Sequence, residues 1–187
     1  VQPAFLPGDT PPAPDELEVV LRQSAEVHKI ADVEVAGFLS GGVDSAYLTA
    51  LARPARTYTI SYAEPKYDES FPARALARSL GVRNRVRRIS PGEFWDAVPA
   101  VQYHMDEPMA DAAAVALYFL NREAARDVKV VLSGEGADEL FGGYNIYRDP
   151  FTARWYNRLP PWLRGGLGAA ASLLPPGPGV NFLAVSY

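Results

Sequence analysis

The pattern of apolar and polar positions alternates between a helical and an extended period along the chain. Helical spacing covers residues 15–31, 43–52, 68–81, 90–106 and 112–127. Shorter stretches rich in β-branched and apolar residues occupy positions 33–40, 55–63, 82–90 and 128–134. Because strands and helices alternate, the pattern predicts an α/β fold in which helices cover both faces of a parallel sheet.

Local signals support these boundaries. Ser90, Pro91 and Glu93 form a capping box with proline at the first helical position, which predicts a helix start. Asp111 is predicted to cap the alanine-rich helix that follows it, and Gly81 to end the helix before it. The stretch 82–90 alternates between apolar and polar residues, which favours a strand near a sheet edge.

Composition narrows the function classes. The 187 residues carry a net charge of −4, which argues against a protein that binds nucleic acid through a basic surface. The chain has no cysteine and two histidines, too few for a typical zinc site. No apolar run reaches the roughly 20 residues of a membrane span, and no secretory signal opens the chain. We therefore expect a cytoplasmic protein without nucleic-acid or membrane partners.

The two ends differ from the middle. Residues 1–14 are proline-rich, which is typical of a linker or the remnant of an upstream region. Residues 15–145 hold the strand and helix pattern of a nucleotide-binding core. Residues 146–187 are aromatic and broken by proline, which predicts a helical C-terminal segment. We expect both ends to have been cut from something longer.

The stretch SGGVDS, Ser40–Ser45, follows the first predicted strand and opens a helix. Its glycines let the backbone turn and approach a ligand. Its serines and the helix N-terminus supply donors for a phosphate. Asp44 would repel a bare phosphate, and a carboxylate with phosphate oxygens is a usual way to hold Mg²⁺. The loop lacks the lysine of a Walker A motif. The alternative is a tight turn with serine and aspartate as caps.

The stretch SGEGADELFGGY, Ser133–Tyr144, follows the last predicted strand. Ser133 and Gly134 can approach a nucleotide, because ligands of such sheets bind at the carboxyl ends of the strands. Glu135, Asp138 and Glu139 crowd carboxylates there, which a cation or a proton would relieve. The alternative is a solvated acidic turn.

Together these motifs resemble a known family. SGGVDS resembles the PP-loop of ATP pyrophosphatases, which form adenylates. SGEGADELFGGY, with YHMDEP at Tyr103–Pro108 and YDES at Tyr67–Ser70, is similar to the synthetase domain of glutamine-hydrolysing asparagine synthetases. The resemblance implies an adenine nucleotide alpha hydrolase-like fold. It also implies a reaction in two steps. MgATP adenylates the aspartate side chain and pyrophosphate is released, and ammonia from glutamine then displaces AMP to give asparagine.

The resemblance also implies roles for single residues. It assigns Glu135 to the adenylation step and Asp44 and Asp138 to Mg²⁺. The residues that it assigns to ATP are Leu39, Ser40, Gly41, Gly42, Asp44, Ser45, Ile60, Ser133 and Gly134. Of these, Leu39 and Ile60 would meet the adenosine through their backbone.

The chain departs from the family pattern at both ends. It has no N-terminal cysteine and no glutaminase domain, and it stops before the downstream region that carries a lysine in the family. We therefore expect the isolated chain to bind MgATP weakly, to make no asparagine and to associate, for example as a homodimer. Two alternatives remain: a relative that adenylates another carboxylate, either β-lactam synthetase-like or another amidotransferase, and a truncated nucleotide-binding module without turnover. Glu135 favours asparagine synthesis, because the β-lactam-forming relatives place tyrosine there.

Overall fold

The computed structural model describes residues 13–144, 158–160 and 163. The chain divides into two compact units, Val1–Glu135 and Gly136–Tyr187, and each is described by itself. The predicted linker at 1–14 and the predicted helical segment at 146–187 lie largely outside the described residues. Both therefore stay predictions, as does the boundary placed between them and the core.

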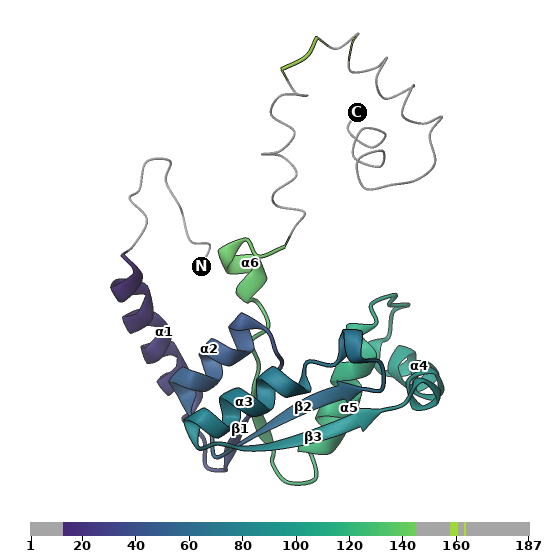
Figure 1. Cartoon of the computed structure of the whole chain (residues 1–187), viewed down its shortest axis with the longest axis horizontal. Coiled ribbons are helices and arrows are strands. Elements are labelled where there is room, and N and C mark those ends of the chain that lie inside the picture. Colours follow the sequence, from purple (N-terminus) through teal and green to yellow (C-terminus); the bar gives the residue numbers. More distant parts are fainter. Residues whose placement is uncertain (1–12, 145–157, 161–162, 164–187) are drawn as a thin grey trace. The chain divides into compact units, whose positions relative to one another are not determined.

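Four parallel strands form one sheet in the described part of the first unit, in the order β3-β2-β1-β4 (Figure 1). The strands are β1 (Val35–Phe38), β2 (Arg56–Tyr62), β3 (Arg83–Ile89) and β4 (Val130–Leu132). All three neighbouring pairs are parallel. The predicted sheet is confirmed, and β3 lies at its edge, as its alternating pattern predicted.

Helices cover both faces of this sheet (Figure 1). The helical elements are α1 (Pro14–His28), α2 (Val43–Ala52), the short 3-10 helix η1 (Pro65–Tyr67), α3 (Ser70–Leu80), α4 (Pro91–Met105) and α5 (Ala113–Ala124). One face is covered by α2 and α3, with α1 packed against α2, while α5 covers the other face and packs against α4. The α/β fold with helices on both faces is confirmed.

The core lies between these layers. On the α5 side, Phe38 and the fully buried Tyr58 pack with Ala124. Further along the same face, Ile89 packs with Phe119 from α5 and with residues of α4. The opposite face carries smaller clusters beneath α2 and α3. Burial of these apolar side chains holds the helices on the sheet.

Helix ends follow the local signals. The Ser90 hydroxyl accepts the Glu93 N–H at 3.3 Å, and the Glu93 carboxylate accepts the Ser90 N–H at 2.9 Å, so the capping box is confirmed. Gly81 ends α3 with φ 70°. The helix α5 begins one residue later than expected, with Ala112 as N-cap, yet Asp111 still accepts the N–H of Ala113 at 2.9 Å.

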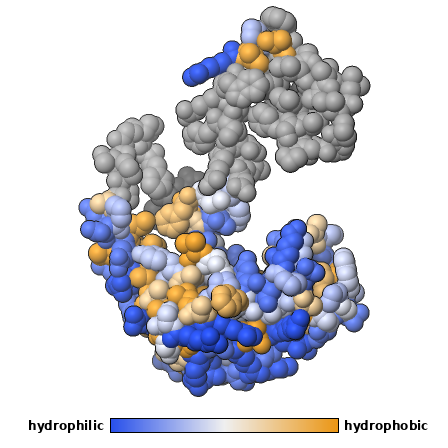
Figure 2. Space-filling model, viewed as in Figure 1, coloured by the Kyte–Doolittle hydropathy of each residue, from blue (hydrophilic) through white to orange (hydrophobic). Residues whose placement is uncertain are grey.

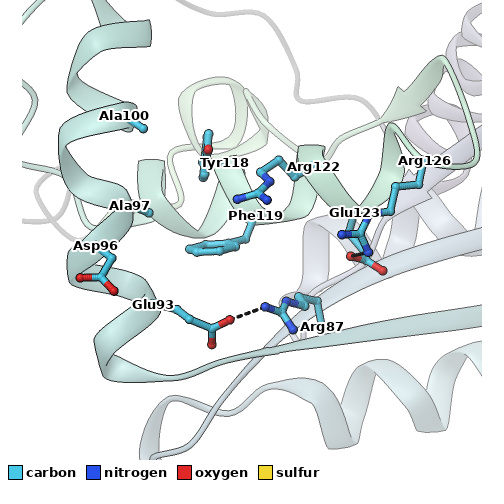
Figure 3. Close-up of a pocket in the computed structure, with 10 residues that line it drawn as sticks. All are labelled: Arg87, Glu93, Asp96, Ala97, Ala100, Tyr118, Phe119, Arg122, Glu123 and Arg126. Atoms are coloured by element: carbon cyan, nitrogen blue, oxygen red, sulfur yellow. Dashed lines mark hydrogen bonds and ion pairs between the residues drawn. The ribbon is translucent and has the colours of Figure 1, made fainter.

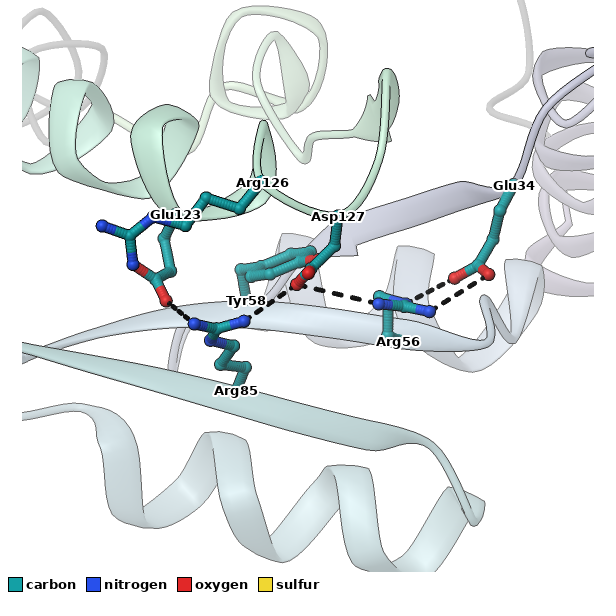
Figure 4. A network of polar contacts seen from close by, with 7 residues as sticks. All are labelled: Glu34, Arg56, Tyr58, Arg85, Glu123, Arg126 and Asp127. Atoms are coloured by element: carbon teal, nitrogen blue, oxygen red, sulfur yellow. Dashed lines mark hydrogen bonds and ion pairs between the residues drawn. The ribbon is translucent and has the colours of Figure 1, made fainter.

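A network of ion pairs lies near the amino ends of the strands (Figure 4). Arg85 donates to Asp127 at 2.9 Å and pairs with the buried Glu123 at 2.5 Å. The Tyr58 hydroxyl donates to the same Asp127 oxygen at 3.0 Å. Arg56, the first residue of β2, pairs with Asp127 at 3.7 Å. These contacts tie β2 and β3 to the segment between α5 and β4.

Apolar side chains also remain at the surface. Figure 2 shows hydrophobic surface on the side that carries α1 and α2, beside hydrophilic surface. On α1 the exposed members are Val19, Val20 and Val27. Among the helices that the structure describes, none is long and apolar enough to cross a membrane.

Candidate functional site

The two motif loops meet at the carboxyl ends of neighbouring strands. The strands β1 and β4 are hydrogen-bonded, and Gly37 is paired with Leu132, so the chain leaves both strands at the same edge of the sheet. A Cβ atom at Gly134 would lie 2.9 Å from the backbone nitrogen of Ser45 and 3.2 Å from the carbonyl carbon of Asp44. Gly134, which belongs to the first unit, therefore lies against the start of α2, as the strand-end rule predicted.

The serines of the first loop bind the loop itself. The Ser40 N–H donates to the Ser45 hydroxyl at 3.0 Å, and the two hydroxyl oxygens lie 2.8 Å apart. The Gly42 N–H donates to the Ser40 hydroxyl at 3.1 Å. Because these contacts fix the turn before α2, the loop is already shaped without a ligand.

Three backbone donors at the start of α2 remain for a ligand. The N–H groups of Val43, Asp44 and Ser45 belong to the first helical turn, where no intrahelical acceptor exists. Within the described residues they make no other hydrogen bond. They point out of the helix N-terminus, where the helix dipole also favours negative charge. This arrangement is typical of a phosphate site.

The loop turns without a left-handed glycine, and the space around Gly41 is restricted by the protein itself. None of the loop glycines has a positive φ, and Gly42 has φ −76° and ψ 156°, so no left-handed turn occurs. Instead, a Cβ at Gly41 would lie 2.9 Å from the Pro72 ring and 3.0 Å from the Glu69 Cβ. The small residue at position 41 therefore lets α3 approach the loop.

The two residues assigned to adenosine lie in the sheet region. Leu39 directly follows β1 and is 2% exposed. Its N–H donates to the Tyr58 carbonyl at 2.9 Å, and its carbonyl accepts the Thr59 hydroxyl at 2.6 Å. The Leu39 carbonyl keeps one lone pair for a ligand. Ile60 lies within β2 and packs against the cluster beneath α4 and α5.

Two of the candidate acids, Asp44 and Glu135, lie in the first unit. Asp44 is exposed on the first turn of α2, and its carboxylate makes no hydrogen bond or ion pair within the described residues. Glu135 is exposed as well, and its N–H donates to the Ser133 hydroxyl at 3.4 Å. No group of three or more histidine and acidic side chains gathers anywhere in the described part of the chain. A cation here would need ligands from a substrate, as Mg²⁺ commonly does with phosphates.

Asp138 belongs to the second unit. It lies in the first turn of the short helix α6 (Ala137–Phe141), which two glycines with positive φ enclose. Within this unit the Tyr144 hydroxyl donates to Glu139 at 2.7 Å, and this hydrogen bond holds the pKa of Glu139 below its usual value. A side chain at Gly143 would overlap the Asp138 carboxylate. The second unit therefore keeps Asp138 at the start of a tightly enclosed turn.

One residue at the site has no role assigned from the sequence. The Gly41 N–H donates to the Glu69 carboxylate at 3.1 Å. Glu69 belongs to the YDES stretch, 28 positions further along the chain. The motif itself was visible in the sequence, but no local pattern indicates that its glutamate reaches the SGGVDS loop.

A cleft of about 290 Å³ lies elsewhere, between α4, α5 and β3 (Figure 3). Its walls are charged, and much of that charge is paired: Arg87 with Glu93, and Glu123 with Arg126 at 2.9 Å. The Arg122 guanidinium lies over the Tyr118 ring. The cleft contains none of the strand-end loop residues, so it is separate from the candidate site.

Comparison with known proteins agrees with this geometry. The Asparagine synthase family model matches residues 16–177. The chain is 40% identical over 166 residues to asparagine synthetase [glutamine-hydrolyzing] 1 of Bacillus subtilis. It is 46% identical over 167 residues to a putative asparagine synthetase [glutamine-hydrolyzing] of Mycobacterium tuberculosis. These alignments cover 87% of the chain, which spans about a quarter (26%) of the length of both relatives.

One solved structure shows a similar fold. An NMN synthetase from Francisella tularensis superposes with a TM-score of 0.51 at 19% identity, covering 72% of this chain and 59% of that chain. At this identity the likeness concerns the fold alone. The family match extends over most of the chain and includes both loops, and relatives at 40% and 46% identity agree with it. The chain therefore belongs to the asparagine synthase family.

Proposed function

We propose that the chain forms the nucleotide-binding part of an asparagine synthetase. In this reaction the aspartate side-chain carboxylate attacks the α-phosphorus of ATP, and pyrophosphate leaves. Ammonia then attacks the activated carbonyl, asparagine forms and AMP leaves. The ammonia would come from glutamine, since the relatives are named as glutamine-hydrolysing. Because the chain spans about a quarter of those relatives, a glutaminase function would lie outside these residues.

The contact between the two loops is the observation that carries this proposal. Gly134 lies against the backbone of Asp44 and Ser45, where the unpaired N–H groups of α2 also lie. A single polyphosphate can therefore reach both loops. The first loop lacks the lysine that γ-phosphoryl transfer commonly uses, which favours loss of pyrophosphate over loss of the γ-phosphate.

The proposed contacts divide along the nucleotide. The pyrophosphate portion would accept hydrogen bonds from the backbone N–H groups in the first turn of α2, Ser45 included. Ser40, Gly41 and Gly42 would form the loop that surrounds it. Ser133 and Gly134 would meet the nucleotide near the α-phosphate. The adenosine would lie against the backbone of Leu39 and Ile60.

Asp44 would hold Mg²⁺ together with oxygens of the bound phosphates, and the family resemblance assigns Asp138 to Mg²⁺ as well. The unpaired, exposed carboxylate of Asp44 beside the phosphate donors fits such an ion, because Mg²⁺ usually takes one or two carboxylates plus substrate oxygens. When bound, the ion would neutralise phosphate charge. Glu135 would serve the adenylation step itself, since it directly follows Ser133 and Gly134, which would meet the nucleotide near the α-phosphate.

Product analysis tests the proposal. A protein that contains this chain and is as long as the curated relatives is mixed with aspartate, ammonium and MgATP. Phosphorus NMR then follows the nucleotide. We expect AMP, pyrophosphate and asparagine in equal amounts. ADP and orthophosphate would contradict the proposal, and AMP with an amide or lactam other than asparagine would favour the relative that activates another carboxylate.

The same assay tests the role of Glu135. Glu135→Ala should lower turnover by about a hundredfold or more, as expected for a group acting on the reacting atoms, while the dissociation constant of MgATP changes little. A loss of MgATP affinity as large as the loss of turnover would show that Glu135 binds the nucleotide instead.

A further inference from the structure

A carboxylate of the protein is bound to the loop proposed for pyrophosphate. The Gly41 N–H donates to the Glu69 Oε2 atom at 3.1 Å. Within the described residues, the Glu69 side chain makes this hydrogen bond and forms no ion pair with a lysine or arginine. Although Glu69 is the N-cap residue of α3, its side chain does not cap that helix. Its carboxylate is directed to the other loop instead.

The contact is held by packing of the backbone. The Glu69 Cβ lies 3.0 Å from the position of a Cβ at Gly41, and the Pro72 ring lies 2.9 Å from it. The loop and the start of α3 therefore leave no room for a side chain at position 41. This packing holds the Glu69 carboxylate beside the Gly41 N–H.

A carboxylate and a phosphate make the same demand on this loop. Each is an oxyanion that accepts a backbone N–H, and one N–H makes one strong hydrogen bond. A phosphate oxygen on the Gly41 N–H would also lie within a few ångströms of the Glu69 charge, and like charges at that distance repel. Glu69 and a bound pyrophosphate group therefore compete for the same donor.

We propose that Glu69 occupies the Gly41 donor in the nucleotide-free protein and that the pyrophosphate group of the nucleotide must displace it. This inference rests on the proposed nucleotide site and adds a residue that sets its affinity. On release of products, Glu69 returns to Gly41 and opposes rebinding of pyrophosphate. Glu69 is thus a positioning residue that weakens anion binding, in contrast to the residues that strengthen it.

The test measures binding of inorganic pyrophosphate to the 187-residue chain by calorimetry, with and without Mg²⁺. Glu69→Gln removes the charge and keeps the size of the side chain, while Glu69→Ala removes the acceptor as well. We expect both variants to bind pyrophosphate about tenfold more tightly than the wild type, because one opposing charge is lost. The matched control is Glu64→Gln, which removes an exposed charge from the same β2–α3 connection without touching Gly41.

A second readout follows the contact itself. In the ligand-free chain, the Gly41 amide resonance should move in Glu69→Gln and Glu69→Ala and stay in place in Glu64→Gln. Pyrophosphate bound equally or more weakly by Glu69→Gln than by the wild type would overturn this inference alone. No binding of pyrophosphate or MgATP by any form, the wild type included, would overturn the nucleotide site as well.

Discussion

The two loops can lie where they do because Gly41 and Gly134 carry no Cβ atom. A side chain at Gly134 would run into the backbone of Asp44 and Ser45, and backbone atoms cannot rotate away as a flexible side chain can. A side chain at Gly41 would likewise meet the start of α3. At both positions the requirement for glycine comes from space between segments that are distant in sequence, and so it is invisible in the local pattern.

We expect Gly134→Ala to separate the two loops. The added Cβ would lie 2.9 Å from the Ser45 nitrogen, so the chain must shift, at a cost of about 1–3 kcal/mol in the free energy of unfolding. Urea unfolding followed by circular dichroism measures this change. The matched control is Gly92→Ala in the first turn of α4, where a Cβ meets nothing within 4 Å.

The control should leave stability unchanged or raise it by up to about 1 kcal/mol, because alanine favours a helix over glycine. If Gly134→Ala were as stable as Gly92→Ala, the close approach of the loops would be wrong. The comparison is sharp because both variants add one methyl group at a glycine of the same unit.

At the scale of elements, the sequence predicted most of what the structure contains. The periods of apolar residues indicated all four strands and the helices from α1 to α5, and the capping box at Ser90 fixed the start of α4. These signals are local, because the spacing of apolar residues in a helix or strand can be recognised from neighbouring positions alone. The alternation of apolar and polar residues in β3 also indicated its place at the edge.

Contacts between elements could not be predicted in the same way. The Asp127 carboxylate accepts hydrogen bonds from Tyr58 of β2 and Arg85 of β3, which lie 69 and 42 positions away in the sequence. Nothing around Asp127 in the sequence distinguishes it from a solvated aspartate at a helix end. The contact of Glu69 with Gly41 is of the same kind. Such pairs follow from strand order and helix packing, which the period of one segment does not encode.

The network at Asp127 gives the fold a dependence on pH. The Tyr58 hydroxyl, and then Arg85 and Arg56, hold the pKa of the Asp127 carboxyl below its usual value. An unfolded chain binds this proton near pH 3.9. The network therefore stabilises the native state above that pH, and the stabilisation is lost as the pH falls through the lowered pKa of the folded state.

Asp127→Asn should accordingly flatten the acid limb of the stability curve. The melting temperature of the wild type should fall steeply from about pH 5 to pH 2.5, and that of Asp127→Asn should start lower and fall less. The control Asp32→Asn changes an exposed aspartate that makes no hydrogen bond or ion pair within residues 13–144. Parallel curves for Asp127→Asn and the wild type would show that the network does not stabilise the ionised carboxylate.

In the first unit, the ion-pair network around Asp127 and the candidate nucleotide site lie at opposite ends of the sheet. Paired charges such as Arg56 with Asp127 lie near the amino ends of the strands and hold the fold together. The unpaired donors and carboxylates lie at the carboxyl ends, on the loops after β1 and β4. The order of strands makes these two loops neighbours, although 88 positions separate Ser45 from Ser133 in the numbering of the sequence.

Amide mapping with MgATP reports directly where the nucleotide binds along the chain. Labelled 187-residue protein is titrated with MgATP, and the backbone amide resonances are followed. We expect the largest shifts at Gly41–Ser45 and at Ser133–Gly134, with small shifts at Arg87 and Arg122 in the separate cleft. Shifts centred on that cleft, or shifts at one loop without the other, would contradict a nucleotide site formed by the two loops together.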